Sequence, residues 1–424
     1  MRGVLAPLFS LYHWLWAFAA AAFFRFPSRQ LFMIGITGTK GKSTTAELID
    51  VILRAEGKRI ALLTSVWRAV GEKRERNVSG NSMPGRGAIQ AFLRRAVRAG
   101  CTHAVIEVTS EGVCQHRHRF IDWDAAAFLN LAPEHIESHG SFEAYRAAKV
   151  AFFSSLAHSA KRERWFFVNA GDQNSAYFVA AAEKIQNAHI VKFTEAPAIK
   201  NPWFAPDFNN ENAAAAAAVA DALGIPAKTI LEALENFRGV PGRLDYVQEK
   251  PFAVVVDYAH TPDSLEKVYQ YLNSQLKTHS SKLICILGSA GGGRDAWKRP
   301  AMGKIAAQYC EEIILTDEDP YDENPATILD EIEKGIGINQ QVTISIDQRL
   351  VNQHKSASDN RHRSVSKILD RREAIRAAVT LARPGDTVVM TGKGSESWIH
   401  MANGKKVAWN ERNETETILG ILNQ

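Results

Sequence analysis

Cysteine is scarce in this sequence, which has four cysteines among 424 residues. Cys101, Cys114, Cys285 and Cys310 lie far apart, and no two of them form a Cys-x-x-Cys pair. A disulfide framework or a zinc site needs more cysteines at closer spacing. The sequence therefore predicts reduced thiols and a cytoplasmic protein.

The excess of one sign of charge is also small, since 51 Lys and Arg against 46 Asp and Glu give a net charge of +5. The chain has no basic stripe with interleaved aromatic residues of the kind that binds nucleic acid. Its length allows two or three domains, and its 46% hydrophobic content is that of a globular protein. We expect a monomeric globular protein without a nucleic-acid partner.

Charged residues are absent from Gly3 to Phe24, a stretch rich in Leu, Phe, Trp and Ala that precedes Arg25 and Arg29. A run of this length can span a bilayer. Its aromatic residues and flanking arginines equally suit a helix lying in a membrane interface. The third alternative is a helix docked on the protein's own surface. We expect an apolar helical segment over residues 1–30, with docking and membrane-surface association through residues 3–24 both open.

What the chain does contain is a glycine-rich turn between the apolar run Leu31 to Ile36 and a helical pattern from Ser43 to Leu53. A strand, a glycine turn and a helix in this order build a phosphate cradle, because free backbone N–H groups and a lysine surround the anion. The strict P-loop pattern has glycine where Ile36 stands, so the loop is a variant. The alternative interpretation of this segment is a glycine-rich turn that binds no ligand. The residues expected to bind ATP are Gly38, Thr39, Lys40, Gly41, Lys42, Ser43 and Thr44.

Strand and helix patterns alternate from Leu31 to about Phe237, which predicts an α/β domain with a mostly parallel sheet. Ligands of such sheets gather at the carboxyl ends of the strands. Gly38, Glu107 and Asn130 all fall at such ends. The sequence therefore places a site at this edge of the sheet.

A joint at Gly239-Val240-Pro241-Gly242 precedes a second alternation with its own glycine-rich turn, Gly288 to Gly293. We expect a smaller α/β domain of dinucleotide-fold type there. The expected domains are residues 1–30, 31–240 and 241–424. The polar, basic run Val351 to Ser366 is interpreted as a loop insertion.

Three more residues lie where chemistry is expected: Glu107 ends a strand, His135 follows another strand, and Lys149 lies on a helix. A carboxylate, an imidazole and the Ser43 hydroxyl around one phosphate can form a Mg²⁺ site. Each residue alone also has a simpler interpretation, as a surface carboxylate, a loop histidine or a solvated lysine.

Together and in this order, the segments resemble the Mur ligase superfamily of ATP-dependent amide-bond ligases, in the branch that adds the third residue of the peptidoglycan stem peptide. The resemblance runs from about Leu31 to the C-terminus. Its motifs are Gly-Thr-Lys-Gly-Lys-Ser-Thr-Thr, Glu107 to Ser110 with Gln115 to Arg117, Glu134-His135 with His139-Gly140, Tyr145 to Lys149, Phe208-Asn209 with Asn212, Gly242-Arg243, Asp257 to Asp263, and Gly392 to Gly394.

The resemblance implies roles for these residues. Lys42 and Ser43 would hold the ATP phosphates and the metal, with Ser43, Glu107, His135 and Lys149 as Mg²⁺ ligands. Lys149 would be carbamylated by CO₂, which fits a buried lysine because burial favours the neutral, reactive amine. The implied catalytic residues are Lys149, Lys42 and His135. The remaining implied ATP-binding residues are Asn209, Asn212, Arg243, Asp257 and His260.

The same resemblance implies a reaction. ATP would phosphorylate the carboxylate of a muramyl peptide, and the amine of an amino acid would then displace phosphate from the acyl phosphate. The alternatives are a folylpolyglutamate-synthase-like ligase with another acceptor and a non-catalytic ATP-binding scaffold. The residues implied to bind the acceptor and the amino acid are Ser110, Gln115, Arg117, Asp319, Tyr321, Lys393 and Glu396.

The sequence departs from the family pattern in three places. Only about thirty residues precede the loop strand, where the family has a uridine-nucleotide-binding domain. Ser395 stands where the family usually has His. Tyr321 and Asp319 lie in the segment where members that select diaminopimelate carry Asp-Asn-Pro-Arg.

This last departure leads to an expectation about the amino acid. The run from Asp317 to Glu323 holds five carboxylates in seven residues. It is either a solvated acidic turn or a pocket that favours a distal amine and disfavours a distal carboxylate. The second interpretation predicts lysine or ornithine over diaminopimelate, with Glu396 helping to hold the amino acid.

Overall fold

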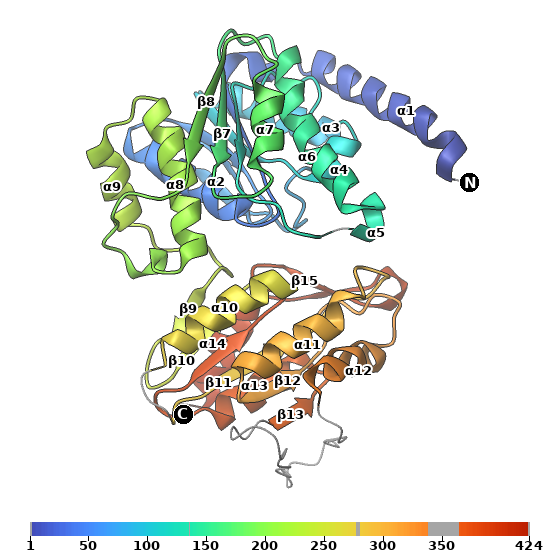
Figure 1. The fold of residues 1–424 in the computed structure, drawn as a ribbon, viewed down its shortest axis with the longest axis vertical. Coiled ribbons are helices and arrows are strands. Elements are labelled where there is room, and N and C mark those ends of the chain that lie inside the picture. Colours follow the sequence, from blue (N-terminus) through green and yellow to red (C-terminus); the bar gives the residue numbers. More distant parts are fainter. Residues whose placement is uncertain (1, 135, 277–279, 338–363, 423–424) are drawn as a thin grey trace. The chain divides into compact units, whose positions relative to one another are not determined.

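The computed structural model describes residues 2–134, 136–276, 280–337 and 364–422 of the chain. These residues form two compact units, Met1–Arg238 and Gly239–Gln424 (Figure 1). The division falls beside the glycines and proline of the joint from Gly239 to Gly242, where the chain turns rather than continuing a helix or strand.

The first unit is built on an eight-stranded sheet with the order β4-β3-β2-β5-β1-β6-β7-β8. Its neighbours are parallel except for the β2–β3–β4 meander, so the mostly parallel sheet is confirmed. The central strands are apolar on both faces, as a sheet covered by helices requires. The strands are β1 Phe32–Thr37, β2 Ile60–Leu63, β3 Trp67–Val70, β4 Lys73–Arg76, β5 His103–Glu107, β6 Ala125–Phe128, β7 Arg164–Asn169 and β8 Ala188–Phe193.

Helices cover this sheet, with α2 packed against α8 and α9 in one group and α4, α6 and α7 in another. Aromatic side chains from α6 and α7, including Phe152, Phe153 and Phe178, complete the core with the strands. The helices are α1 Arg2–Phe23, α2 Lys42–Ala55, α3 Arg86–Arg98, α4 Ser110–Cys114, α5 Ile136–His139, α6 Phe142–Ser155, α7 Ser175–Ala182, α8 Asp207–Ala222 and α9 Ala227–Glu235, with 3₁₀ turns η1 Pro27–Gln30, η2 Leu156–His158 and η3 Pro202–Phe204.

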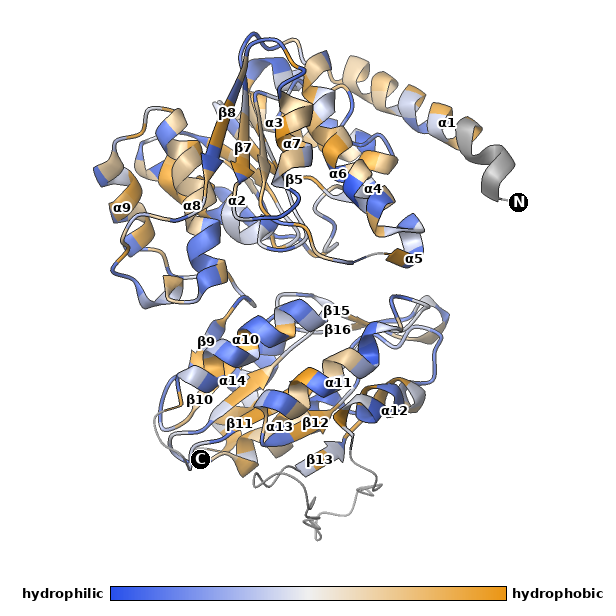
Figure 2. Ribbon diagram, in the orientation of Figure 1, coloured by the Kyte–Doolittle hydropathy of each residue, from blue (hydrophilic) through white to orange (hydrophobic). Residues whose placement is uncertain are grey.

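Helix α1 lies on the first unit and packs against α3. The Ser10 hydroxyl lies 2.7 Å from Nε2 of His116, and Trp14 and Phe18 meet the ring of Phe120 edge-on. One face of α1 is therefore docked on the protein's own surface, which was the third alternative for this segment. Figure 2 colours much of the helix as hydrophobic. The large apolar side chains that stay exposed on it include Leu8, Phe9, Leu11, Tyr12, Leu15, Trp16 and Phe23.

Within the described ranges, no helix combines the length and the apolarity that crossing a membrane requires.

The second unit contains a six-stranded sheet with the order β13-β12-β11-β14-β10-β9, parallel except for β9. This confirms the smaller parallel α/β domain predicted from the second alternation. A separate antiparallel pair is formed by β15 and β16. The strands are β9 Asp245–Gln248, β10 Ala253–Val256, β11 Leu283–Leu287, β12 Glu312–Leu315, β13 Ser364–Lys367, β14 Thr387–Met390, β15 Trp398–His400 and β16 Lys406–Ala408.

Helices α13 and α14 supply buried side chains to one core of this unit, while α11 packs against α10 and α12. The helices are α10 Pro262–Ser274, α11 Lys298–Tyr309, α12 Pro325–Ile336, α13 Arg371–Leu381 and α14 Glu411–Leu422, with the 3₁₀ turn η4 Ala402–Gly404.

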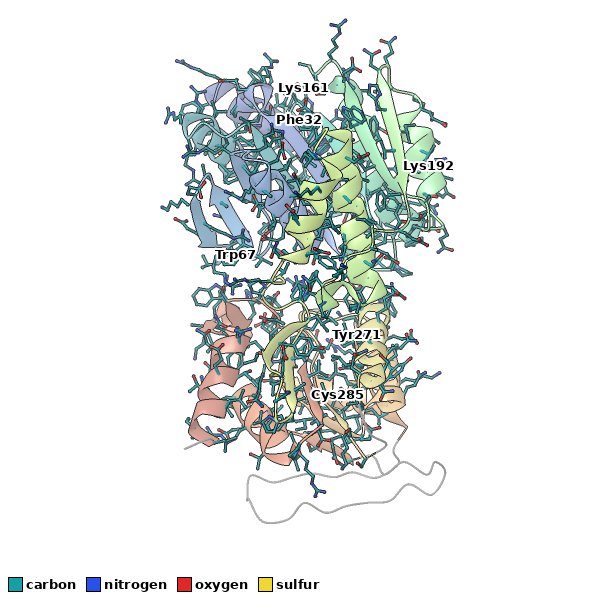
Figure 3. The ribbon with its side chains drawn as sticks, turned by 90° about the vertical axis from the view of Figure 1, so that its left-hand side faces the viewer. Phe32, Trp67, Lys161, Lys192, Tyr271 and Cys285 are labelled. Carbon is teal, nitrogen blue, oxygen red and sulfur yellow. A yellow bond between two sulfur atoms is a disulfide. The ribbon has the colours of Figure 1, made fainter. Side chains whose placement is uncertain are left out.

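Two predictions about this unit are wrong. Cys285 in β11 and Cys310 directly after α11 form a disulfide, with their Cα atoms 6.0 Å apart (Figure 3). The sequence hides this pair because a whole strand–helix unit separates the two cysteines, and only the fold brings the end of α11 back to β11. Cys101 and Cys114 are free thiols, as predicted.

The second error concerns the predicted loop insertion. Val351 to Arg363 lies outside the described residues, but Ser364 to Ser366 belongs to the edge strand β13. Its polar residues look like a loop in the sequence because an edge strand needs only one neighbour and stays half-exposed.

Candidate functional site

The glycine-rich segment from Gly38 to Gly41, called the phosphate loop below, lies between β1 and α2. It packs against α8. Gly41 has a φ of +82°, and a Cβ atom there would approach Oδ1 of Asn212 to 2.1 Å. The Thr45 hydroxyl donates to the same oxygen at 3.2 Å. Asn209, one turn earlier on α8, donates to the carbonyl of Trp203 at 2.8 Å. The structure thus places Asn212 directly on the loop, with Asn209 on the same helix.

Replacing Gly41 with alanine tests this packing. Holding a non-glycine residue in the left-handed backbone conformation costs about 1 kcal/mol of stability at any position. At Gly41 the added methyl group must also displace Asn212. We expect the kcat/KM for ATP to fall on the order of 100-fold, as a shift of about 1 Å at a reacting centre does. Gly57→Ala is the matched control, since Gly57 has a φ of +73° with no atom within 4 Å of an added Cβ. Equal kinetic effects in both variants would contradict the account.

Three lysines surround the loop. Lys42 donates from Nζ to the carbonyls of Gly38 and Thr39 at 2.9 and 2.8 Å. Lys149 also donates to the carbonyl of Gly38, at 2.8 Å. Lys40 forms an ion pair of 2.9 Å with Glu134. The predicted catalytic pair, Lys42 and Lys149, therefore meets at one backbone oxygen of the loop.

Lys149 is almost completely buried in α6, with 2% of its surface exposed. Burial, followed by the nearby charge of Lys42, holds the pKa of this amine well below its usual range. The buried side chain is therefore stabilised as a neutral amine, and only the neutral form can add to CO₂. This is the chemistry that carbamylation needs.

A chain of polar contacts joins the start of α2 to the end of β5. The Ser43 hydroxyl lies 3.0 Å from that of Ser65, and the backbone N–H of Ser65 donates to Oε1 of Glu107 at 3.0 Å. Glu107 is 2% exposed. Carboxylate and hydroxyl oxygens suit Mg²⁺, which keeps most of its shell as water and phosphate oxygen. Ser43 and Glu107 therefore fit a phosphate-bound Mg²⁺.

The two remaining predicted metal ligands are His135 and Lys149. His135 lies outside the described residues. In the part of the chain that the structure describes, no cluster of three or more His, Cys, Asp or Glu could hold a metal. Lys149 contacts Gly38 and the ring of Tyr145 and does not touch Glu107. Its role as a metal ligand stays a prediction.

The residues predicted to bind the acceptor are held around α4. The Ser110 hydroxyl lies 3.1 Å from Nε2 of His139. Arg117 donates from Nε and Nη2 to the side-chain oxygen of Gln115, at 3.1 and 2.6 Å. Arg86 donates to the backbone carbonyl of the same glutamine, at 3.0 and 2.6 Å. Two guanidinium groups thus meet on one residue that carries no charge.

The predicted ATP residues of the second unit also lie together within that unit. Asp257 accepts a hydrogen bond from the backbone N–H of Leu244 at 2.6 Å. The guanidinium of Arg243 lies 4.1 Å from the ring centre of Tyr258, and Nδ1 of His260 lies 2.7 Å from the Tyr258 carbonyl. Their contact with ATP stays a prediction.

Lys393 is the centre of the predicted amino-acid site. It is completely buried and forms ion pairs with Asp319 at 2.9 Å and Glu396 at 2.6 Å. Glu396 also accepts a hydrogen bond from the Tyr258 hydroxyl at 3.0 Å. Tyr321 stacks on His400, with ring centres 5.1 Å apart. The structure therefore brings Lys393, Asp319 and Glu396 together.

The acidic run from Asp317 to Glu323 carries less free negative charge than its sequence indicates. Burial raises the pKa of Asp317 to about 6 and that of Glu318 to about 7. Asp319 is paired with Lys393, and Glu323 pairs with Arg299 at 2.7 Å.

Sequence reasoning assigned no individual role to several residues of the site. Ser65 follows the apolar run from Ile60 to Leu63, so a position near the carboxyl edge of the sheet could be inferred from the sequence. Tyr145 entered only as the first residue of the motif Tyr145 to Lys149; its hydroxyl lies 3.1 Å from that of Thr39 and its ring meets His139 edge-on. The other residues in this group are Arg86, Glu134 and Arg294.

The phosphate loop, its parallel sheet and the helix that follows place the first unit among nucleotide-binding α/β domains. Two family models match the chain: the Mur ligase middle domain over residues 36–213, and the Mur ligase, glutamate ligase domain over residues 242–394.

UDP-N-acetylmuramyl-tripeptide synthetase of Roseiflexus sp. (strain RS-1) is 35% identical over 99% of this chain and 82% of its own length. The chain belongs to the Mur ligase family. A solved UDP-N-acetylmuramoyl-L-alanyl-D-glutamate--2,6-diaminopimelate ligase matches with a TM-score of 0.59 at 25% identity, over 93% of this chain and 79% of that one. Folylpolyglutamate synthase of Mycobacterium tuberculosis, complexed with ADP and AMPPCP, shares the fold with a TM-score of 0.65 at 15% identity, over 89% and 91% of the chains.

Proposed function

We propose that this protein is an ADP-forming ligase that joins an amino acid to the carboxylate of a UDP- or lipid-linked muramyl peptide, in the synthesis of a peptidoglycan precursor. The observation that carries the proposal is Lys149, which is buried, has a pKa held well below its usual range and is hydrogen-bonded to the phosphate loop at Gly38. A phosphate loop that only binds nucleotide has no need of a desolvated amine, which is costly to bury. The names of the relatives supply the substrate class.

The reaction balances as follows. An oxygen of the acceptor carboxylate attacks the γ-phosphorus of ATP, and ADP leaves. The amine of the amino acid then attacks the acyl carbon, and inorganic phosphate and one proton leave. Bound Mg²⁺ would neutralise charge on the phosphates, and Ser43, Glu107 and His135 would hold it together with carbamylated Lys149.

The residues of the first unit prepare this step. The N–H groups at the start of α2 and the ammonium of Lys42 attract the phosphates. Binding of a phosphate would draw Lys42 away from the carbonyls of Gly38 and Thr39, to which it now donates. Arg117, held by Gln115, would position the acceptor. We propose residues 31–240 as the ATP-binding domain and residues 241–424 as the amino-acid-binding domain.

A panel of acceptors tests the proposal. ADP release would be measured with UDP-linked and lipid-linked muramyl peptides and with a folate, each with and without amino acids. We expect release only when a muramyl peptide and an amino acid are both present. Turnover with folate alone would replace the cell-wall acceptor by a folylpolyglutamate-type one. ATP binding without turnover under every combination would indicate a non-catalytic scaffold.

We also expect the protein to use lysine or ornithine as the added amino acid in preference to diaminopimelate. The structure adds a competing group, because the guanidinium of Arg294 lies 4.7 Å from the ring centre of Tyr321. The test is the ratio of kcat/KM for lysine and diaminopimelate. We expect Tyr321→Arg with Asp319→Asn to shift the ratio toward diaminopimelate. A parent protein that prefers diaminopimelate, and loses the preference in Arg294→Ala, would contradict the prediction and assign the distal carboxylate to Arg294.

A further inference from the structure

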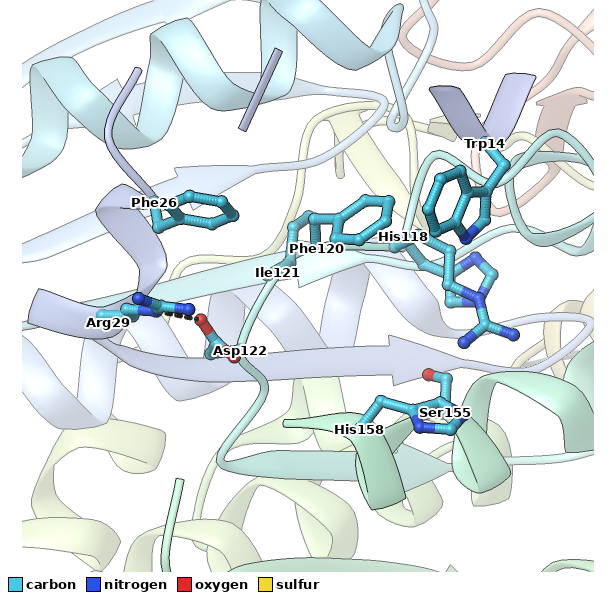
Figure 4. A pocket seen from close by; sticks show the side chains of 10 residues that line it. Trp14, Phe26, Arg29, His118, Phe120, Ile121, Asp122, Ser155 and His158 are labelled. Atoms are coloured by element: carbon cyan, nitrogen blue, oxygen red, sulfur yellow. Dashed lines mark hydrogen bonds and ion pairs between the residues drawn. The ribbon is translucent and has the colours of Figure 1, made fainter. Parts of the chain in front are cut away.

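A pocket of about 420 Å³ lies in the first unit, where α1, the segment from His118 to Asp122 and the end of α6 meet. Figure 4 shows Phe120 and Trp14 along one side of this pocket, with Ser155 and His158 opposite them. Its volume is in the range of pockets that hold small organic ligands. None of its lining residues belongs to the catalytic set described above.

The pocket has an uncompensated positive charge. Arg119 lines it, and its side chain makes no hydrogen bond or ion pair with any described residue. Its Nε is shielded from solvent and has no partner. The one carboxylate of the lining, Asp122, is already paired with Arg29 at 3.2 Å and accepts a hydrogen bond from the N–H of Ala160. An anion in the pocket would satisfy Arg119.

A second, independent feature is the imidazole of His118. The residue is 3% exposed, and its Nδ1 has no hydrogen-bond partner among the described residues. Burial, followed by the charges of Arg119 and His116, lowers its pKa to about 3, so the ring is neutral. Buried polar atoms are nearly always paired in folded proteins. His118 therefore offers an unused hydrogen-bonding group to a ligand.

Aromatic surfaces complete the pocket. Trp14 meets Phe120 edge-on, with ring centres 5.1 Å apart, and Phe26 carries the guanidinium of Arg29 at 4.5 Å. Flat apolar rings beside cations suit a ligand with an anionic part and a planar or apolar part. Inorganic phosphate alone would leave these rings uncovered.

Helix α6 carries both Lys149 and a residue of the pocket, Ser155. Lys149 and Ser155 are on the same helix, six residues apart, which is a rise of about 9 Å along its axis. The segment that carries His118 and Arg119 directly follows Gln115 and Arg117, which are implied to contact the acceptor. The inference therefore requires an acceptor that extends from Lys149 toward the carboxyl end of α6.

We propose that this pocket binds the diphosphate end of the acceptor, with the phosphates on Arg119 and the attached group against Trp14 and Phe120. The inference rests on the proposed function for the identity of the ligand. Uridine diphosphate and a polyprenyl diphosphate share this chemistry. Helix α1 then serves as a wall of the acceptor site.

Calorimetric titration of the full chain with UDP, farnesyl diphosphate, uridine and pyrophosphate tests the proposal without turnover. We expect UDP or farnesyl diphosphate to bind, uridine and pyrophosphate to bind more weakly, and Arg119→Gln to weaken the bound diphosphate at least about tenfold, the loss of one charge-assisted hydrogen bond. Arg95→Gln, on the exposed side of α3, is the control. Trp14→Leu should weaken binding while Trp16→Leu, on the exposed face of α1, should not.

Kinetics separate this inference from the proposed function. Arg119→Gln should raise the KM for a diphosphate-bearing acceptor and leave the KM for ATP unchanged. No binding of either diphosphate, or equal losses in Arg119→Gln and Arg95→Gln, would overturn the pocket assignment even if the ligase is active. Binding of a diphosphate by a protein without ligase activity would retain the pocket and refute the function.

Discussion

Replacing Lys149 with alanine is expected to abolish turnover while leaving ATP binding largely intact. The side chain is buried beside Gly38, and its lowered pKa favours the neutral amine, which is the form that reacts with CO₂. The variant removes the implied carbamate ligand without touching the helix N-terminus that holds the phosphates. The measurement is ADP release with both substrates, alongside calorimetric binding of an ATP analogue.

Chemical rescue distinguishes a lost ligand from a lost contact. Short-chain carboxylates added in solution should partly restore the activity of Lys149→Ala, because they can occupy the space of the missing carbamate. Lys149→Met is the matched control, since it fills the cavity and leaves no room for an added carboxylate. It should stay inactive under the same conditions. Full activity in Lys149→Ala would remove the residue from the mechanism.

Replacing Arg371 with methionine is expected to destabilise the second unit by about 3–5 kcal/mol, the usual cost of leaving one partner of a buried ion pair alone. Arg371 and Glu411 are 1% and 0% exposed at the side chain and lie 2.6 Å apart. The guanidinium also donates to the carbonyls of Asp317 and Thr391 at 3.1 and 2.7 Å. The variant therefore removes the donor of two carbonyls and the ionic partner of the Glu411 carboxylate, which keeps only the indole N–H of Trp409 as a side-chain donor among the described residues.

The adjacent residue provides the control for this prediction. Arg372 pairs with Glu414 at 2.7 Å, but its side chain is 50% exposed. Arg372→Met should cost about 1 kcal/mol or less, as exposed pairs do. Urea unfolding followed by circular dichroism measures both variants. Equal losses of stability would show that the Arg371–Glu411 pair contributes no more than a surface contact.

Elements in the centre of each sheet could be predicted from the sequence, because burial on both faces leaves a simple apolar signature. β10, Ala253–Val256, has the bounds that its run of valines predicts. The hairpin of β3 and β4 could not be found in this way. Its second strand, Lys73–Arg76, consists of charged residues, and arginines of that strand cover Trp67 from the neighbouring strand. Such a strand is specified by its partners in the sheet.

The residues of the candidate site differ in the same way: some have a local signal in the sequence, and others are defined only by contacts in the fold. Glu107 was predictable because it ends a buried parallel strand, where ligands of such sheets gather. Ser65 and Tyr145 act through contacts with Ser43 and Thr39 that join distant parts of the chain. For the acidic run around Asp319, the sequence left a solvated turn and a pocket as open alternatives. A count of carboxylates could not show that Asp319 is paired with Lys393 and accepts a hydrogen bond from the backbone N–H of His400.

The path of one oxygen atom tests the central claim most directly. An acceptor with an ¹⁸O-labelled carboxylate would be incubated with ATP and the amino acid, and the released phosphate analysed by mass spectrometry. The account predicts one ¹⁸O atom in each phosphate, because the carboxylate oxygen that attacks the γ-phosphorus leaves with it when the amide forms. Phosphate without label, its new oxygen taken from water, would show that the protein hydrolyses ATP without activating the acceptor, and would contradict the account.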